Sequence, residues 1–343
     1  MSLNDFDALL VLSFGGPEGV DEVVPFLENV TRGRGIPRER LEVVGEHYFH
    51  FDGISPINGQ NREIIANIEA ELARKGYDLP VYFGNRNWHP LAADTARQIA
   101  ADGHKTVLVF ATSAWGGYSA CRQYDEDIQA MREIVPELEF TKLWQFYSHP
   151  TFIQLNAAPL RHAWVNANQQ DTKVLFTAHS VPTAADKVAG GPDDSHLYSR
   201  QVAEAARLIA EAAEIPDYEV VWQSRSGNPA TPWLEPDVVD RTEELAREGF
   251  NAIICVPVGF ITDHMEVIWD LDTELQQACD ERGVTLTRTP TVGLTPEFAS
   301  MIVEIAENIA DETVPPSLST ITVSGCTVNG APCAPACCQI SRQ

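Results

Sequence analysis

Two segments in the second half of the chain carry side chains that could handle protons or a metal. His179 follows the apolar run KVLFTA, and an imidazole there can accept a proton or bind a metal because it titrates near neutral pH. A structural histidine at a strand end is equally compatible with this position. The neighbouring Ser180 could be a nucleophile, but no G-x-S-x-G turn surrounds it, which argues against a hydrolase.

A row of carboxylates follows the apolar run AIICV. Glu266, Asp270 and Glu274 are spaced four residues apart, which predicts that they share one face of a helix. Asp263 lies just ahead of this row, and Asp272 lies off it. Such a row suits a route for a hard divalent cation or for protons. A solvated acidic helix face has the same pattern, but a histidine at the mouth of the same sheet favours function.

Two arginines stand among glycines in the segment TRGRG. Arg32 and Arg34 could bind carboxylates or phosphates, since a guanidinium group pairs with both in a bidentate manner. An ordinary basic turn is the alternative, although a local arginine pair is informative in a chain this acidic. Aromatic side chains that could wall a large flat ligand, or simply fill the core, are Phe14, Tyr48, Phe49, Phe51, Trp115 and Tyr124.

Cysteines concentrate at the end of the chain. Four of the seven are Cys326, Cys333, Cys337 and Cys338, close enough in sequence to reach one site. Thiolates suit iron–sulfur clusters and zinc, and stable disulfides are rare in cytosolic proteins. The spacing fits no common zinc pattern. A metal or cluster site is the favoured interpretation, and a disordered tail with incidental cysteines is the alternative.

Short apolar runs alternate with amphipathic stretches along the chain, which predicts parallel sheets covered by helices on both faces. We expect two tandem α/β domains, 1–148 and 149–312, each with a four-stranded parallel sheet, then a Cys-rich tail, 313–343. The expected strands are 8–14, 80–83, 106–112, 139–145, 173–177, 219–223, 252–256 and 285–288. The expected helices are 61–75, 91–102, 124–134, 198–214, 237–248, 267–282 and 296–311, the last able to pack back on the first domain. Ligands bind beyond the carboxyl ends of such strands.

Composition excludes several functions. The 343 residues include 24 Lys and Arg against 49 Asp and Glu, a formal charge of −25, which argues against nucleic acid or an anionic membrane as a partner. No apolar run approaches the roughly 18 residues of a membrane helix. No basic residue precedes Arg32, so no signal peptide is expected. We expect a cytoplasmic protein, with peripheral membrane contact left open.

Several longer segments resemble a known family. They are LLVLSFGGPEGVDEVVPFLENVTRGR, GISPINGQ, VYFGNRNWHP, FTAHSVP and PVGFITDHMEVIWDLDTE. Together they resemble the ferrochelatases, specifically the actinobacterial type grouped with the coproporphyrin ferrochelatases, from about residue 7 to 312. The resemblance implies two flavodoxin-like (Rossmann-like) domains that hold a porphyrin in a cleft between them. It also implies insertion of Fe²⁺ with release of two protons, as a step of haem biosynthesis.

The resemblance assigns roles to particular residues. His179 and Glu266 correspond to the residues that take the pyrrole protons and present the metal, and Asp270 and Glu274 to an outer acidic route for metal or protons. Which of the first two does which is left open. The predicted porphyrin-binding residues are Arg32, Arg34, Ser55, Tyr124 and Phe14. Phe14 departs from the tyrosine of many bacterial relatives, and a phenyl ring cannot ligate iron.

The tail also resembles a family feature, a [2Fe–2S] cluster held by cysteines. Cys326, Cys333, Cys337 and Cys338 are the predicted ligands, and no internal cysteine is an obvious match. Coproporphyrin III is the implied substrate, with protoporphyrin left open, and a transient contact with the next haem-pathway enzyme is expected. The alternatives are a chelatase for another metal and tetrapyrrole, and a carrier that binds haem or porphyrin without reaction.

Overall fold

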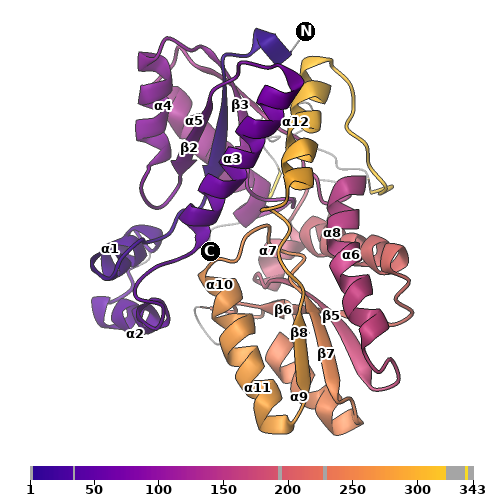
Figure 1. Ribbon diagram of the computed structural model, residues 1–343. Helices are drawn as coiled ribbons and strands as arrows, with labels where there is room; N and C mark the ends of the chain where they lie inside the picture. Colours follow the sequence, from indigo (N-terminus) through magenta and orange to yellow (C-terminus); the bar gives the residue numbers. More distant parts are fainter. Residues whose placement is uncertain (1–2, 34, 192–194, 227–229, 322–336, 339–343) are drawn as a thin grey trace.

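Two parallel sheets organise the chain in the computed structural model (Figure 1). The structure describes residues 3–33, 35–191, 195–226, 230–321 and 337–338. Arg34, Cys326 and Cys333, three of the predicted site residues, lie outside these ranges.

The first sheet has the strand order β2-β1-β3-β4, all parallel. Its strands are β1 (Ala8–Ser13), β2 (Val81–Asn85), β3 (Thr106–Ala111) and β4 (Glu139–Lys142). Every residue of β1 is buried, because helices cover both faces of the sheet. Leu9 and Val11 face the large core under α3 (Ile57–Lys75) and α12 (Pro296–Ala310). Leu10 and Leu12 face a second core under α4 (Ala92–Ala101) and α5 (Gln123–Ile134).

The second sheet repeats this arrangement in the order β6-β5-β7-β8. Its strands are β5 (Thr172–His179), β6 (Tyr218–Gln223), β7 (Ala252–Val256) and β8 (Thr285–Arg288). In both sheets the first strand along the chain lies between the second and the third, which is the flavodoxin-like order. The predicted fold class, two tandem α/β units with four-stranded parallel sheets, is confirmed.

Twelve α-helices surround the sheets in the described ranges. In the first half they are α1 (Val20–Val30), α2 (Arg38–Phe49), α3 (Ile57–Lys75), α4 (Ala92–Ala101) and α5 (Gln123–Ile134). In the second half they are α6 (Pro150–Asn166), α7 (Thr183–Lys187), α8 (Leu197–Ala213), α9 (Val238–Glu248), α10 (Met265–Ile268), α11 (Gln276–Arg282) and α12 (Pro296–Ala310). A 3-10 turn (Leu3–Asp5) and two π-helical turns (Tyr118–Arg122 and Asp270–Leu275) complete the described elements.

The predicted helix over 267–282 is present, but it is not one regular α-helix. The segment instead consists of α10, the π-helical turn Asp270–Leu275 and α11. The wider turn changes which side chains become neighbours, with consequences for the acidic row. Four helices escaped prediction: α1 contains an internal proline at Pro25, α2 has polar residues around most of its surface, α6 contains Pro159, and α7 is only five residues long.

The two halves share one continuous core. Residues of the first sheet and of the second sheet, such as Phe110 and Phe176, belong to the same buried cluster. Helix α12 packs against α3 and α6 (Figure 1), and Glu307 of α12 accepts hydrogen bonds from Lys75 Nζ at 2.6 Å and Tyr77 Oη at 2.9 Å. The predicted division at residue 148 falls in the connection between β4 and α6 and stays a prediction. No helix within the described ranges is long and apolar enough to cross a membrane.

Candidate active site

His179 and Glu266 meet at the carboxyl end of the second sheet. His179 is the last residue of β5, and Glu266 lies in the first turn of α10, which follows the loop after β7. His179 Nε2 lies 3.3 Å from Glu266 Oε1. Their side chains are 33% and 47% exposed, so a ligand lying over this edge could reach both. The structure therefore brings together the two residues for which sequence analysis predicts proton and metal chemistry.

Hydrogen bonds hold both the ring and the backbone of His179. Its Nδ1 bonds to the carbonyl of Ser180, and the hydroxyl of Tyr198 donates to the His179 carbonyl at 2.8 Å. A carbonyl only accepts hydrogen bonds, so Nδ1 carries a hydrogen. A hydrogen on Nε2 is then needed to bond the Glu266 carboxylate, which makes the imidazole cationic in this arrangement.

The electrostatics of the pair agree with this protonation state. Burial lowers the pKa of His179, but the Glu266 charge and hydrogen bond outweigh it and raise that pKa to about 9. Burial raises the pKa of Glu266, but the His179 charge and hydrogen bond outweigh it and lower that pKa to about 2. At neutral pH the pair therefore holds its proton on His179, as an imidazolium that faces the Glu266 carboxylate at 3.3 Å.

Two further residues, His264 and Gln223, position Glu266. The Glu266 backbone N–H donates to His264 Nδ1 at 3.1 Å, and Gln223 Nε2 donates to the Glu266 carbonyl at 2.7 Å. Gln223 is the buried last residue of β6 and accepts from the Thr177 hydroxyl at 2.8 Å. Burial lowers the pKa of His264, consistent with a neutral ring that accepts a hydrogen bond. Sequence analysis missed both, although His264 stands in the DHMEV segment and Gln223 ends a predicted strand.

Asp270 occupies a different environment from Glu266. Its carboxylate accepts hydrogen bonds from the Ser224 hydroxyl and from Gln223 Nε2 at 3.5 Å. Burial, together with the Glu266 and Glu274 charges, raises the pKa of Asp270 to about 7, although the Ser224 hydrogen bond lowers it. A carboxyl group that titrates near neutral pH beside the His179–Glu266 pair can take a proton and pass it on.

The structure sorts the acidic residues of this segment into two groups. Arg288 binds Asp263 at 3.1 Å and Asp272 at 2.9 Å, so these two carboxylates are occupied in ion pairs. Glu266, Asp270 and Glu274 do not pair with Arg288, and Glu274 instead accepts from the Trp269 indole at 2.9 Å. Across the described residues, no three or more His, Cys, Asp or Glu side chains are arranged to hold one metal ion. The four predicted metal residues thus do not form one closed coordination site.

An aromatic wall from the first half approaches this site. Phe14 follows β1, is 40% exposed, and packs edge-on against Phe26 with ring centroids 6.3 Å apart. Phe26 in turn packs edge-on against Tyr48, with ring centroids 5.8 Å apart. Burial and the charges of Glu266 and Asp270 raise the pKa of Tyr48, which places its phenol in the field of the acidic residues. Phe14 thus offers an exposed aromatic surface at the carboxyl end of the first sheet.

The other predicted substrate residues lie in varied surroundings. Arg32 is exposed just after α1. Ser55 is buried, and its N–H donates to the Pro17 carbonyl at 2.9 Å. Tyr124 is buried in α5, its hydroxyl 3.1 Å from Thr112 Oγ1. Binding of a porphyrin by these residues stays a prediction.

Two of the predicted thiol ligands lie within the described residues. Cys337 and Cys338 are buried, with their sulfurs 3.7 Å apart. Gly190 N–H donates to Cys338 Sγ at 3.4 Å, and Cys338 N–H donates to the Gly190 carbonyl at 3.0 Å. These bonds attach Cys338 to the loop between α7 and α8.

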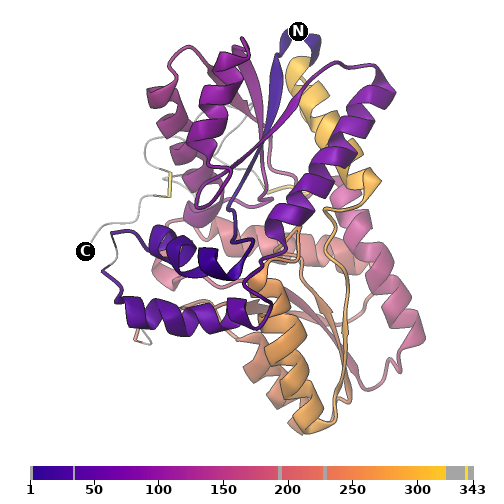
Figure 2. The same ribbon diagram turned by 60° about the vertical axis from the view of Figure 1, so that its left-hand side comes forward.

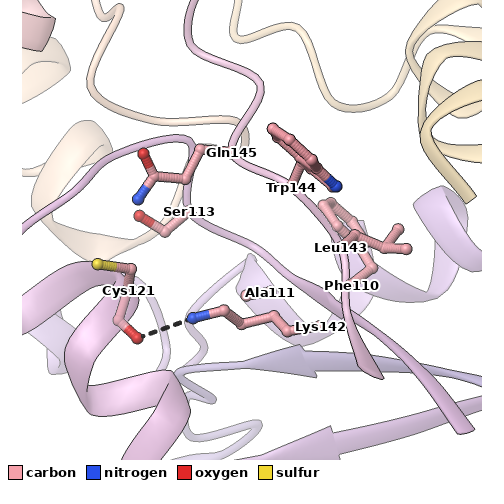
Figure 3. Close-up of a pocket in the computed structure, with 8 residues that line it drawn as sticks. All are labelled: Phe110, Ala111, Ser113, Cys121, Lys142, Leu143, Trp144 and Gln145. Carbon is pink, nitrogen blue, oxygen red and sulfur yellow. Dashed lines mark hydrogen bonds between the residues drawn. The ribbon is translucent and has the colours of Figure 1, made fainter. Parts of the chain in front are cut away.

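A separate small pocket lies at the end of β4 (Figure 3). Lys142 Nζ donates to the Cys121 carbonyl there at 3.1 Å and pairs with Asp125 at 2.7 Å, so its buried charge is compensated. None of the predicted site residues lines it. The lining residues are Phe110, Ala111, Ser113, Cys121, Lys142, Leu143, Trp144 and Gln145.

Two flavodoxin-like sheets in tandem define an α/β fold that solved chelatases share. SirB from Bacillus subtilis with Fe³⁺ superposes with a TM-score of 0.54 at 12% identity, over 91% of this chain and 100% of that one. The sirohydrochlorin chelatase SirB from Bacillus subtilis subspecies spizizenii, in complex with cobalt, superposes with a TM-score of 0.53 at 13% identity. The match covers 91% of this chain and 100% of that one. At such identities the likeness shows the fold alone.

Sequence comparison gives the family. The profile described as Ferrochelatase matches residues 6–309. Proteins named coproporphyrin III ferrochelatase are 55% identical in Corynebacterium glutamicum (98% of this chain, 93% of the relative) and 53% identical in Nocardia farcinica (98% and 97%). Another protein of this name, in Mycolicibacterium smegmatis, is 51% identical over 97% of this chain and 99% of the relative. The chain belongs to the ferrochelatase family, which confirms the resemblance seen in the sequence.

Proposed function

We propose that this protein inserts Fe²⁺ into coproporphyrin III in haem biosynthesis. Relatives of about half-identical sequence that carry this name support the substrate. The observation that carries the proposal is the His179–Glu266 contact of 3.3 Å, next to a carboxyl group, Asp270, whose pKa is raised to about 7. Metal insertion replaces two pyrrole N–H hydrogens by one Fe²⁺, so two protons must leave, and this group of residues can accept them.

The proposed route for protons follows the contacts in order. The imidazolium of His179 must first give up its Nε2 proton, and an arriving dication favours this loss by electrostatic repulsion. Glu266 at 3.3 Å accepts that proton and, being itself exposed, releases it to solvent or to Asp270, whose pKa of about 7 suits a second acceptor. The neutral His179 then takes one pyrrole proton, and a second passage through the same groups removes the other, so that both protons leave as Fe²⁺ enters. Glu274 and Asp270 would meet the metal before it reaches the porphyrin, since carboxylate oxygens suit a hard, partly hydrated cation.

The proposed porphyrin contacts come mainly from the first half of the chain. The exposed ring of Phe14 offers a flat apolar surface and no metal ligand. Arg32 is exposed and, with Arg34 beside it in sequence, would bind propionates. Coproporphyrin carries four propionates, so arginines are needed to hold it on a chain with a net charge of −25. We keep Ser55 and Tyr124 as proposed contacts of the macrocycle edge.

An anaerobic insertion assay tests the proposal. Fe²⁺ is added to the protein with coproporphyrin III or protoporphyrin IX, and metalation is followed by porphyrin absorbance. We expect detectable turnover with both porphyrins. The kcat/KM for coproporphyrin III should be at least about tenfold higher, a preference that one additional arginine–propionate pair can provide. Tight binding without metalation would instead indicate a carrier. Faster insertion of Co²⁺ into a reduced tetrapyrrole would indicate a different chelatase.

A second proposal concerns the tail: Cys326, Cys333, Cys337 and Cys338 hold a [2Fe–2S] cluster. The described thiols fit this donor set, because two thiolates at about 2.3 Å from one tetrahedral metal are about 3.8 Å apart, and the Cys337 and Cys338 sulfurs are 3.7 Å apart. Gly190 N–H donates a hydrogen bond to Cys338 Sγ, and hydrogen bonds to ligand sulfurs set the reduction potential of iron–sulfur clusters. Such a cluster would supply one-electron redox chemistry, which metal insertion does not use.

Cluster content can be measured without turnover. Protein purified without air should contain about two iron atoms and two acid-labile sulfides per chain, and visible absorption bands. We expect Cys338→Ala to lose both the sulfide and the bands. Cys279→Ala, a buried cysteine of α11 outside the tail, is the matched control and should keep them. Wild-type protein without sulfide, or Cys338→Ala protein with full sulfide, would contradict the proposal.

A further inference from the structure

A stacked pair of rings joins the two halves of the molecule beside the acidic residues. His47 lies in α2 of the first half, and Trp269 directly follows α10 in the second. Their ring centroids are 4.1 Å apart with an interplanar angle of 9°, and His50 contacts the same indole edge-on at 5.7 Å. Both ribbon views show the end of α2 beside α10 (Figures 1 and 2). Neither the proton route nor the porphyrin contacts described above use this pair.

The same indole binds the outermost carboxylate of the acidic row. Trp269 Nε1 donates to Glu274 Oε1 at 2.9 Å. Glu274 is solvent-exposed, and an exposed glutamate ordinarily samples several rotamers. A charge-assisted hydrogen bond from a ring that is itself stacked selects one of them. Trp269 therefore sets where the Glu274 carboxylate lies.

The π-helical turn makes this contact possible. Residues five apart on an α-helix are separated by about 140° around the axis and do not face each other. In the turn Asp270–Leu275 the Glu274 N–H bonds instead to the Trp269 carbonyl at 2.9 Å, five residues back. This wider turn brings the side chains of Trp269 and Glu274 to the same side. Single π-turns inserted in helices are frequent at functional sites.

We propose that Trp269 is a positioning residue for metal delivery: it fixes Glu274 at the outer end of the acidic row, and His47 fixes Trp269 from the other half of the molecule. This inference rests on the proposed function, because Glu274 matters here as a carboxylate that meets Fe²⁺ before insertion. A stack that served packing alone would affect stability and would leave metal affinity unchanged.

Conservative variants separate the hydrogen bond from the stack. Trp269→Phe keeps an aromatic ring for His47 and removes the indole N–H, and we expect it to raise KM for Fe²⁺ by about 3- to 10-fold. We expect kcat at saturating iron and KM for porphyrin to stay within about twofold. His47→Phe keeps the stack and should resemble wild type, whereas His47→Ala should raise KM for Fe²⁺ by about 2- to 5-fold.

A double-mutant cycle and a matched control complete the experiment. In a Glu274→Gln background, Trp269→Phe should cause no further rise in KM, because the carboxylate that the indole holds is already gone. His104→Ala, which removes an aromatic pair with Tyr82 near the amino ends of the first sheet, should leave KM unchanged. Additive effects of Trp269→Phe and Glu274→Gln would overturn the inference.

Metal binding measured without porphyrin keeps the two proposals distinguishable. Calorimetric titration of the porphyrin-free protein with Co²⁺, which needs no turnover, should give a Kd about 3- to 10-fold weaker for Trp269→Phe than for wild type, at equal melting temperature. If wild type inserts no iron but Co²⁺ binding weakens as expected, the proposed function fails and the positioning role stands. If wild type inserts iron and Trp269→Phe changes neither KM nor Kd, the positioning role fails alone.

Discussion

His179→Ala should lower kcat for iron insertion by about 10²- to 10⁴-fold, the range that a positioned proton-transfer group contributes. The variant loses the imidazole that lies 3.3 Å from Glu266, so no neutral base remains on β5 to take a pyrrole proton. It also leaves the Glu266 carboxylate without its cationic partner. We expect porphyrin affinity, followed by fluorescence quenching, to stay within about threefold, because aromatic and arginine contacts in the first half provide it.

A surface histidine supplies the control for this substitution. His162 is exposed in the last turns of α6, which lead to the amino end of β5, whereas His179 lies at its carboxyl end, and His162→Ala should insert iron at the wild-type rate. The melting temperatures of both variants show whether a lower insertion rate results from unfolding of the protein. If His179→Ala keeps more than about a tenth of wild-type kcat while it still binds porphyrin, another group takes the pyrrole protons and the proposed role of His179 is wrong.

The sheets were predictable from sequence because parallel strands buried on both faces leave a strong signal. The runs that begin at Ala8 and Ala252 are largely apolar, and the observed strands match the predicted bounds to within one residue. Helices α1 and α6 were not predicted because a proline interrupts each. Local propensity disfavours proline in a helix, but packing against the rest of the molecule overrides that preference.

Some of the active-site residues were also predictable from the sequence, and others were not. His179 and Glu266 could be predicted because each follows a recognisable strand, and the carboxyl ends of parallel strands converge. The predicted helical face of carboxylates was incomplete, since its geometry depends on a π-helical turn that the i, i+4 spacing does not reveal. Arg288 pairs with Asp263 and Asp272, the two carboxylates outside the row, and this pairing is visible only in three dimensions because Arg288 comes from the neighbouring strand β8. Gln223 escaped notice because an amide carries no charge or motif.

Glu266→Gln should change both the titration of His179 and the rate. The Glu266 charge and hydrogen bond are what raise the pKa of His179 to about 9 against the effect of burial. Without the carboxylate, burial dominates, and the pKa of His179 should fall below its ordinary value of 6.5. NMR titration of the histidine ring measures this directly. We expect kcat to fall by at least about 10²-fold, since Glu266 relays the proton that His179 gives up.

The stability of this variant should depend on pH in a defined direction. A raised histidine pKa contributes stability that is present in full below 6.5 and is lost as pH rises through about 9. A lowered glutamate pKa contributes stability that is present above 4.5 and is lost as pH falls through about 2. Wild type should therefore exceed Glu266→Gln in melting temperature most between about pH 4.5 and 6.5, and the difference should disappear near pH 10. Glu281→Gln, an exposed carboxylate of α11, should show no such dependence. A stability difference that is equal at pH 6 and pH 10 would mean that His179 and Glu266 do not share a proton.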